Sequence, residues 1–312
     1  MNQTNSIPNQ FRLTLLLMTT LFAIVLLGCD ATATTSTASS SQPSSASKPV
    51  SDNPMSDNPP RKRAAVENPA GLMPAGKLID LTHAFDATTI YWPTEQGFRL
   101  EAGKNGVTEK GYYYSANRFA TAEHGGTHLD APIHFAAERH TADQVELERL
   151  IGEAAVIDVT KACAANPDYQ ITVGDLRAWE EQQQRKLDEV IVLLRTGWSR
   201  FWPERLRYLG TETLGPDAVA ELHFPGLSAE AAKWLVEQRN IKAVGIDTAS
   251  IDYGQSTHFE THVIFCTHNL PIFENVANLD QLPADRSLVI ALPIKIAGGS
   301  GGPLRIIAIV PE

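Results

Sequence analysis

The stretch His124-Gly-Gly-Thr-His128-Leu-Asp130-Ala-Pro-Ile-His134 places three imidazoles and one carboxylate within eleven residues. Imidazole and carboxylate together suit zinc, manganese or iron(II), whereas calcium and magnesium prefer shells made only of oxygen. On a straight strand the four side chains would be spread over about 33 Å, at roughly 3.3 Å per residue, and could not share one ion. A metal site therefore requires the backbone to bend within the stretch.

Three residues of the stretch allow this bend. Gly125 and Gly126 can take the positive φ angles of a tight turn, which would bring the first histidine back beside the second. Pro132 fixes a second change of direction before the last histidine. A helix is disfavoured because adjacent glycines and an internal proline cost helix propensity. We therefore expect a strand, a turn and a strand that gather metal ligands; a histidine-rich surface turn without metal is the alternative.

The stretch resembles the H-x-G-T-H-x-D-x-P-x-H motif of the metal-dependent cyclase-like hydrolases, a family that includes bacterial kynurenine formamidases and isatin hydrolases. Weaker matches run from about Leu78 to the C-terminus, and they are Asp80-Leu-Thr-His83, Tyr91-Trp92-Pro93, Leu193 to Trp198, Phe224-Pro-Gly-Leu227, Gly245-Ile-Asp247 and Gly298 to Pro303. The resemblance implies an α/β fold in which a mixed β-sheet curls into a barrel-like core with flanking helices, the cyclase-like swivelling β/β/α fold. It also implies a homodimer or homotetramer in which a neighbouring chain can help to line the pocket.

A second group of candidate ligands, His262 and Glu274, lies far downstream. Their spacing matches the distal pair of the family, in which the histidine completes a second metal position and the glutamate can bridge two ions. Glu274 stands in an apolar context, where burial of an unpaired carboxylate would be costly, and this favours a ligand role. A core or surface position is the alternative for His262. His258 and His268 are interpreted as neighbours that could orient a ligand.

These residues predict a hydrolytic reaction. We expect His124, His128 and Asp130 to hold a divalent ion with open positions, where a bound water can lose a proton near neutral pH. His134 is the predicted catalytic residue, a general base toward the water and then an acid toward the leaving nitrogen; the resemblance gives the matching residue the same role. Trp92 matches the aromatic substrate-contact position of the family and could stack on a planar ring. Ordinary core packing is the alternative for this tryptophan.

We therefore predict a metal-dependent hydrolase that cleaves the carbon-nitrogen bond of a small aryl or cyclic amide, with one or two Zn²⁺ or Mn²⁺ ions per chain. Two alternatives stay open: a periplasmic metal-binding lipoprotein without catalysis, and a metal-dependent cyclase or dehydratase. A serine hydrolase is disfavoured because the sequence has no G-x-S-x-G elbow. The glycine-rich segment 298–302 precedes a proline and a strand, so it predicts a loop beside the pocket or a simple turn, and not a phosphate cradle.

The first quarter of the chain differs from the rest. After Arg12, the uncharged apolar run Leu13 to Leu27 has the length of a signal-peptide core and is shorter than the roughly 20 residues of a membrane span. Residues 1–29 resemble a bacterial lipoprotein signal peptide with Cys29 as the lipidated residue, which implies a cell-envelope protein held at the membrane and facing the periplasm or the outside. A cleaved secretory peptide or a short membrane anchor is the alternative. Residues 30–71, rich in Ser, Thr and Pro, predict a disordered tether, and residues 72–312 predict a single domain.

Charge and cysteine content narrow the remaining possibilities. The net charge is −10, with the acidic residues dispersed, so nucleic-acid binding is not expected. If lipid occupies Cys29, only Cys163 and Cys266 remain, and these could form a disulfide or stand as two buried thiols.

Hydrophobic patterning predicts a mixed order of strands and helices. Short aliphatic runs indicate buried strands over 154–159, 190–194, 243–246, 288–292 and 304–310. Helices are expected over 174–184 and over 229–238, the latter with Ser228 as its N-cap. The aromatic residues Tyr112 to Tyr114, Trp198, Phe201 and Trp202 could either wall the pocket or pack in the core.

Overall fold

The computed structural model describes residues 75–312. The expected signal peptide, the lipidation site Cys29 and the expected tether lie outside these residues. Within 75–312, no helix is both long and apolar enough to cross a membrane.

Seven strands form a closed ring. In ring order they are β12 (Gly301–Pro311), β11 (Ser287–Pro293), β5 (Ile151–Asp158), β7 (Val190–Arg195), β9 (Ala243–Ile246), β10 (Ile272–Glu274) and β4 (His128–Asp130). The ring closes because β4 pairs with β10 on one side and with the first residues of β12 on the other. An eighth strand, β1 (Gly76–Asp80), pairs with the end of β12. Strands β5, β7, β9 and β10 are parallel and the other pairs antiparallel, so the predicted mixed, barrel-like sheet is confirmed.

Alternation along the strands divides the core into two layers. In β7, Val192 and Leu194 pack toward α3 (Val173–Gln183), α5 (Ala229–Gln238) and α6 (Glu260–Thr267). Ile191 and Leu193 point the other way, into a cluster drawn from β4, β10, β11 and β12 that fills the ring. Parallel strands buried on both faces read as continuous aliphatic runs, which is why the sequence predicted them.

The expected helices form with local caps. Ser228 accepts a hydrogen bond from the Ala231 N–H at 3.2 Å at the start of α5. Thr172 and Asp175 form a capping box at the start of α3, one residue earlier than the sequence suggested. The remaining short elements are α1 (Leu147–Leu150), α2 (Thr160–Ala165), α4 (Arg205–Leu209), β6 (Gln170–Ile171), β8 (Gly226–Leu227) and the 3₁₀ helices η1 (Pro132–His134), η2 (Trp198–Phe201), η3 (Pro216–Glu221) and η4 (Leu279–Gln281).

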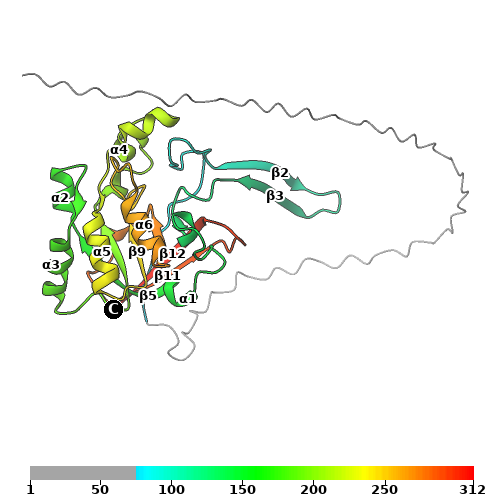
Figure 1. The fold of residues 1–312 in the computed structure, drawn as a ribbon. Coiled ribbons are helices and arrows are strands. Elements are labelled where there is room, and N and C mark those ends of the chain that lie inside the picture. The colour runs from blue at the N-terminus through cyan, green and yellow to red at the C-terminus, as the bar shows by residue number, and fades with distance from the viewer. Residues whose placement is uncertain (1–74) are drawn as a thin grey trace, which may run out of the picture. The chain divides into compact units, whose positions relative to one another are not determined.

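The strands β2 (Arg99–Val107) and β3 (Tyr113–Ala120) form a hairpin that stands apart from the barrel (Figure 1). Almost all of its side chains are exposed. The tyrosines at 112–114 lie at this hairpin, so they are neither pocket walls nor core residues.

The two cysteines of the described residues are separate buried thiols. Cys163 lies in α2 and Cys266 in α6, and neither forms a disulfide. The sequence left open a disulfide or two buried thiols, and the structure has two buried thiols.

Candidate metal centre

The predicted turn within the histidine motif is present. Gly125 and Gly126 have φ angles of 147° and 58°, and the Gly126 N–H donates to the Ile90 carbonyl at 3.0 Å. A Cβ atom on Gly126 would lie 2.6 Å from the Phe85 ring, so the turn needs glycine for space as well as for conformation. The chain then enters β4 and, at Pro132, turns into the 3₁₀ helix η1. The bends expected at the glycines and at the proline both occur. Of the two strands expected around the turn only the second, β4, is present, because residues 121–127 form no strand.

The turn brings the first three predicted ligands together. The Nδ1 atom of His124 lies 2.6 Å from Asp130 Oδ1, and the Nε2 atom of His128 lies 3.1 Å from the same oxygen. One ligand atom from each of the three residues falls within 4.8 Å of the others. The near segment, residues 124–134, therefore supplies a three-atom donor set.

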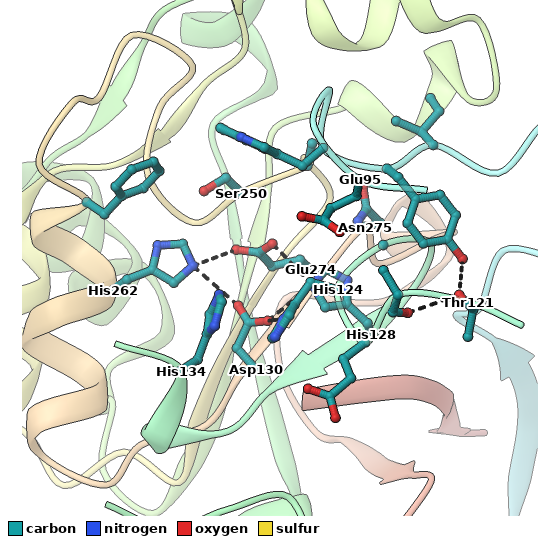
Figure 2. A pocket seen from close by; sticks show the side chains of 18 of the residues that line it. Glu95, Thr121, His124, His128, Asp130, His134, Ser250, His262, Glu274 and Asn275 are labelled. Carbon is teal, nitrogen blue, oxygen red and sulfur yellow. Dashed lines mark hydrogen bonds and ion pairs between the residues drawn. The ribbon is translucent and has the colours of Figure 1, made fainter. Parts of the chain in front are cut away.

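The distant segment, residues 252–275, adds a second donor set on the same centre (Figure 2). Glu274 ends β10 directly opposite His128 in the antiparallel pairing with β4, and His262 lies in the first turns of α6. The Nε2 atom of His262 is 3.1 Å from Glu274 Oε1 and 3.3 Å from Asp130 Oδ2. Asp130 thus belongs to both donor sets, one oxygen to each.

Each imidazole is oriented by its other nitrogen. The Nδ1–H of His128 donates to the Gly126 carbonyl at 2.9 Å, and the Nδ1–H of His262 donates to Asp252 at 2.6 Å. These bonds leave both Nε2 atoms facing Asp130 and Glu274.

His124 is oriented in the same way through a hydroxyl group. The Ser300 hydroxyl donates to Glu123 at 2.5 Å, so its oxygen accepts from the Nε2–H of His124 at 2.8 Å. Outer partners of this kind fix the tautomer of metal-binding histidines, so the three rings fit a divalent ion.

The charges of the centre also fit a cation. Asp130 and Glu274 are 1% and 4% exposed, and no lysine or arginine lines the cavity around them. Burial opposes the charged form of His128, but the Asp130 carboxylate outweighs it and raises the pKa of this imidazole to about 9. Burial and the charge of Asp130 raise the pKa of Glu274 above its usual range. Two buried carboxylates so close together need positive charge, which a divalent cation supplies.

The predicted catalytic residue borders this centre and an open cavity. The His134 ring stacks on the His124 ring with centroids 3.7 Å apart. Within residues 75–312, neither ring nitrogen of His134 has a hydrogen-bond partner. Burial lowers the pKa of His134 to about 4, so the ring is neutral at pH 7.

The cavity itself measures about 530 Å³ and has aromatic walls formed by Tyr91, Trp92, Phe135 and Phe259. Trp92 therefore lines it, as its predicted role requires, and packs edge-on against Phe259 with centroids 6.1 Å apart.

Other histidines and aromatic residues singled out in the sequence lie elsewhere. His258 and His268 are exposed and do not line the cavity. His83 stacks on Trp202 at 4.2 Å, also outside it. Trp198 and Phe201 pack with each other at 5.2 Å in the core.

The sequence did not predict Asp252 and Ser300, which form hydrogen bonds with the second ring nitrogens of His262 and His124. Asp252 has no local pattern that marks it, because its role depends on where α6 packs. Ser300 lies in the glycine-rich segment expected beside the pocket, and that position was the only available signal.

Comparisons with known proteins agree with this geometry. Residues 79–253 match the family model described as a putative cyclase. The chain is 30% identical over 210 residues to an isatin hydrolase from Roseibium aggregatum, covering 65% of this chain and 77% of that one. It is 29% identical over 231 residues to a kynurenine formamidase from Erythrobacter litoralis, covering 74% and 93%.

Two solved structures of isatin hydrolases are also similar to this chain. The isatin hydrolase A of Labrenzia aggregata bound to benzyl benzoate superposes with a TM-score of 0.68 at 33% identity, over 76% of this chain and 94% of that one. The enzyme of the same name from Ralstonia solanacearum gives a TM-score of 0.67 at 31% identity, over 75% and 92%. These similarities support metal-dependent amide hydrolysis by this chain.

Proposed function

Because the chain belongs to the putative cyclase family, we propose that it is a metal-dependent amidohydrolase that cleaves the carbon-nitrogen bond of a small aryl or cyclic amide. The proposed ligands are His124, His128, Asp130, His262 and Glu274, holding one or two Zn²⁺ or Mn²⁺ ions. The proposed catalytic residue is His134, and the proposed substrate contact is Trp92.

One observation carries the proposal: an imidazole without a hydrogen-bond partner among the described residues lies beside the donor sets, in the same aromatic-walled cavity. His134 stacks on the candidate ligand His124 and lines the cavity with Trp92. A site that only stores metal has no need of a neutral imidazole aimed at space large enough for a small molecule. Binding cavities for such molecules are typically about 300–1,000 Å³ and mostly apolar.

The metal ligands, His134 and the cavity wall would each have a separate role in the reaction. A divalent ion bound here would lower the pKa of water and polarise a carbonyl oxygen. His134, neutral at pH 7, accepts a proton from the attacking water through a ring nitrogen and returns it to the leaving nitrogen. The water adds to the carbonyl carbon, the carbon-nitrogen bond breaks, and the products are a carboxylic acid and an amine. The walls around Trp92 hold the ring of the substrate and limit access of other water.

A substrate panel tests the proposal. Protein reconstituted with Zn²⁺ or Mn²⁺ would be incubated with formanilide, isatin, simple lactams and lactones, and the products identified by mass spectrometry. Gain of one water by an aryl or cyclic amide supports the proposal. Loss of water would indicate a cyclase or dehydratase, and metal-loaded protein that converts none of the compounds would favour a metal-binding protein without catalysis.

Self-association is also proposed, as a homodimer or homotetramer. The support comes from the β2–β3 hairpin, where Leu100 and Phe119 lie opposite each other and are 62% and 57% exposed. An isolated two-stranded hairpin is marginally stable in water, so burial against a second copy would stabilise it. Sedimentation of the L100E/F119E variant should then give a smaller species than the wild type.

We further propose lipid attachment at Cys29 and a location in the cell envelope, on the strength of the sequence pattern alone. The full-length chain should fractionate with membranes, and the C29A variant should not.

A further inference from the structure

The candidate cavity has two carboxylates that lie outside both donor sets. Besides Asp130 and Glu274 it is lined by Glu95 and Glu123, and by no lysine or arginine. Asp130 and Glu274 belong to the donor sets and would face the metal, whereas Glu95 and Glu123 belong to neither set and face the space that a substrate would occupy.

Of these two, Glu123 is already engaged. Its carboxylate accepts hydrogen bonds from the backbone N–H of Ser300 at 3.0 Å and from the Ser300 hydroxyl at 2.5 Å. This pair of bonds fixes Glu123 as part of the support for His124. Both bonds go to Oε2 of Glu123, so this carboxylate is held at one edge of the cavity.

Glu95 differs because its side chain has no hydrogen bond or ion pair within residues 75–312. Its only polar contact is through the backbone, where its N–H donates to the Trp92 carbonyl at 3.0 Å. That turn keeps the carboxylate next to the aromatic wall, and Figure 2 shows Glu95 turned into the cavity, on the side of Glu274. Arg99 borders a neighbouring hollow that Glu95 also lines, but no ion pair joins the two. Glu95 is thus a carboxylate directed at the substrate space.

A carboxylate beside aromatic rings favours one kind of ligand. It attracts an ammonium group by charge and hydrogen bonding, and the face of a tryptophan adds a cation–π contribution. The same carboxylate repels a substrate that carries a free carboxylate. A neutral ring with no polar substituent is indifferent to it.

We propose that Glu95 is a specificity-determining residue that selects amide substrates bearing a cationic amino group over matched neutral or anionic ones. This inference rests on the proposed function, since it names the substrate class of the same site. The residue takes no part in the bond cleavage.

Three formanilides with the same ring test this inference: one with a para-methyl group, one with a para-aminomethyl group and one with a para-carboxymethyl group. Values of kcat/KM would be measured for metal-loaded wild type, E95Q, E95K and a control, E101Q, whose carboxylate lies on the exposed hairpin. We expect the wild type to prefer the cationic compound over the methyl compound by up to about 5-fold, the upper end for an ion pair at an exposed residue such as Glu95. E95Q should remove the preference, E95K should invert it toward the carboxylate, and E101Q should leave it unchanged. Added salt should weaken the preference.

A binding measurement separates this inference from the proposed function. Affinities of the same three compounds for the metal-loaded H134A protein would be measured by calorimetry, which needs no turnover. Tighter binding of the cationic compound that disappears in H134A/E95Q supports the role of Glu95 even if no compound is hydrolysed. Equal affinities for the three compounds, or a cation preference that survives E95Q, would overturn it.

Discussion

The near segment, 124–134, and the distant segment, 252–275, supply the same centre but are positioned in different ways. The near segment makes its own geometry, because the Gly125-Gly126 turn and the short strand β4 place its ligands within a few residues of one another. The distant segment has none of this local closure: His262 is delivered by a helix, and Glu274 by the pairing of β10 with β4. The local sequence therefore positions the ligands of the near segment, and the tertiary fold positions those of the distant segment. Asp130 contributes to both donor sets.

The largest expected effect separates proton transfer from metal binding within the near segment. H134A should lower kcat by about 10²–10⁴-fold, the usual contribution of a positioned acid–base residue. Metal content should stay at the wild-type level, because His134 belongs to neither donor set. The matched control is H268A, an exposed histidine outside the cavity, which should leave both quantities unchanged. Loss of metal in H134A would make this residue a ligand instead.

A second comparison tests whether Asp130 joins the two segments. D130N should weaken metal binding by more than the roughly 100-fold typical of outer partners, since its carboxylate contributes to both donor sets. E274Q should have a smaller effect, because it leaves the donor set of the near segment intact. Competition with a chromophoric chelator measures both affinities. Equal losses in the two variants would contradict the division into two sets that share one residue.

The outer partner of the distant segment should matter less than a ligand. D252A removes the acceptor that orients His262, and we expect metal affinity to fall by about 10–100-fold. D252N keeps an oxygen acceptor and should lose less. The control is a surface pair in which Asp168 Oδ2 lies 2.9 Å from His223 Nδ1. D168A should leave metal affinity unchanged. An unchanged affinity in D252A would mean that the packing of α6 alone orients His262.

The last prediction concerns folding stability instead of metal affinity, at the turn of the near segment. G126A places a side chain at a φ of 58° and against the Phe85 ring. The left-handed conformation costs about 1–2 kcal/mol and the overpacking about 1–3 kcal/mol more. G298A has a similar φ of 73° with no atom within 4 Å, so it should show only the first cost. Urea unfolding compares the two, and equal losses would show that the Phe85 contact is unimportant.

The contrast between the segments also explains what could be predicted from the sequence. The near segment was predicted with its bends, because glycine and proline act on the backbone locally. His262 and Glu274 were found through a family spacing, whereas Asp252 was missed because its separation of 10 residues from His262 matches no recognised motif. The strands β5, β7, β9, β11 and β12 were predicted from aliphatic runs, and β4 from the turn in the histidine motif. Strand β10 was missed because it has three residues, too few to give a period. The β2–β3 hairpin was missed because its strands bury no face and carry no alternating pattern.

The central claim is that the two segments meet at Asp130 to hold a divalent metal. The most direct test is a crystal of the wild-type protein grown with Zn²⁺ or Mn²⁺, with diffraction data collected on both sides of the absorption edge of the metal. We predict an anomalous peak about 2.0–2.3 Å from an Asp130 oxygen and from imidazole nitrogens of the near segment. A second peak, between Asp130, His262 and Glu274, would mark a two-ion centre. No peak within bonding distance of Asp130 in metal-soaked crystals would contradict the account.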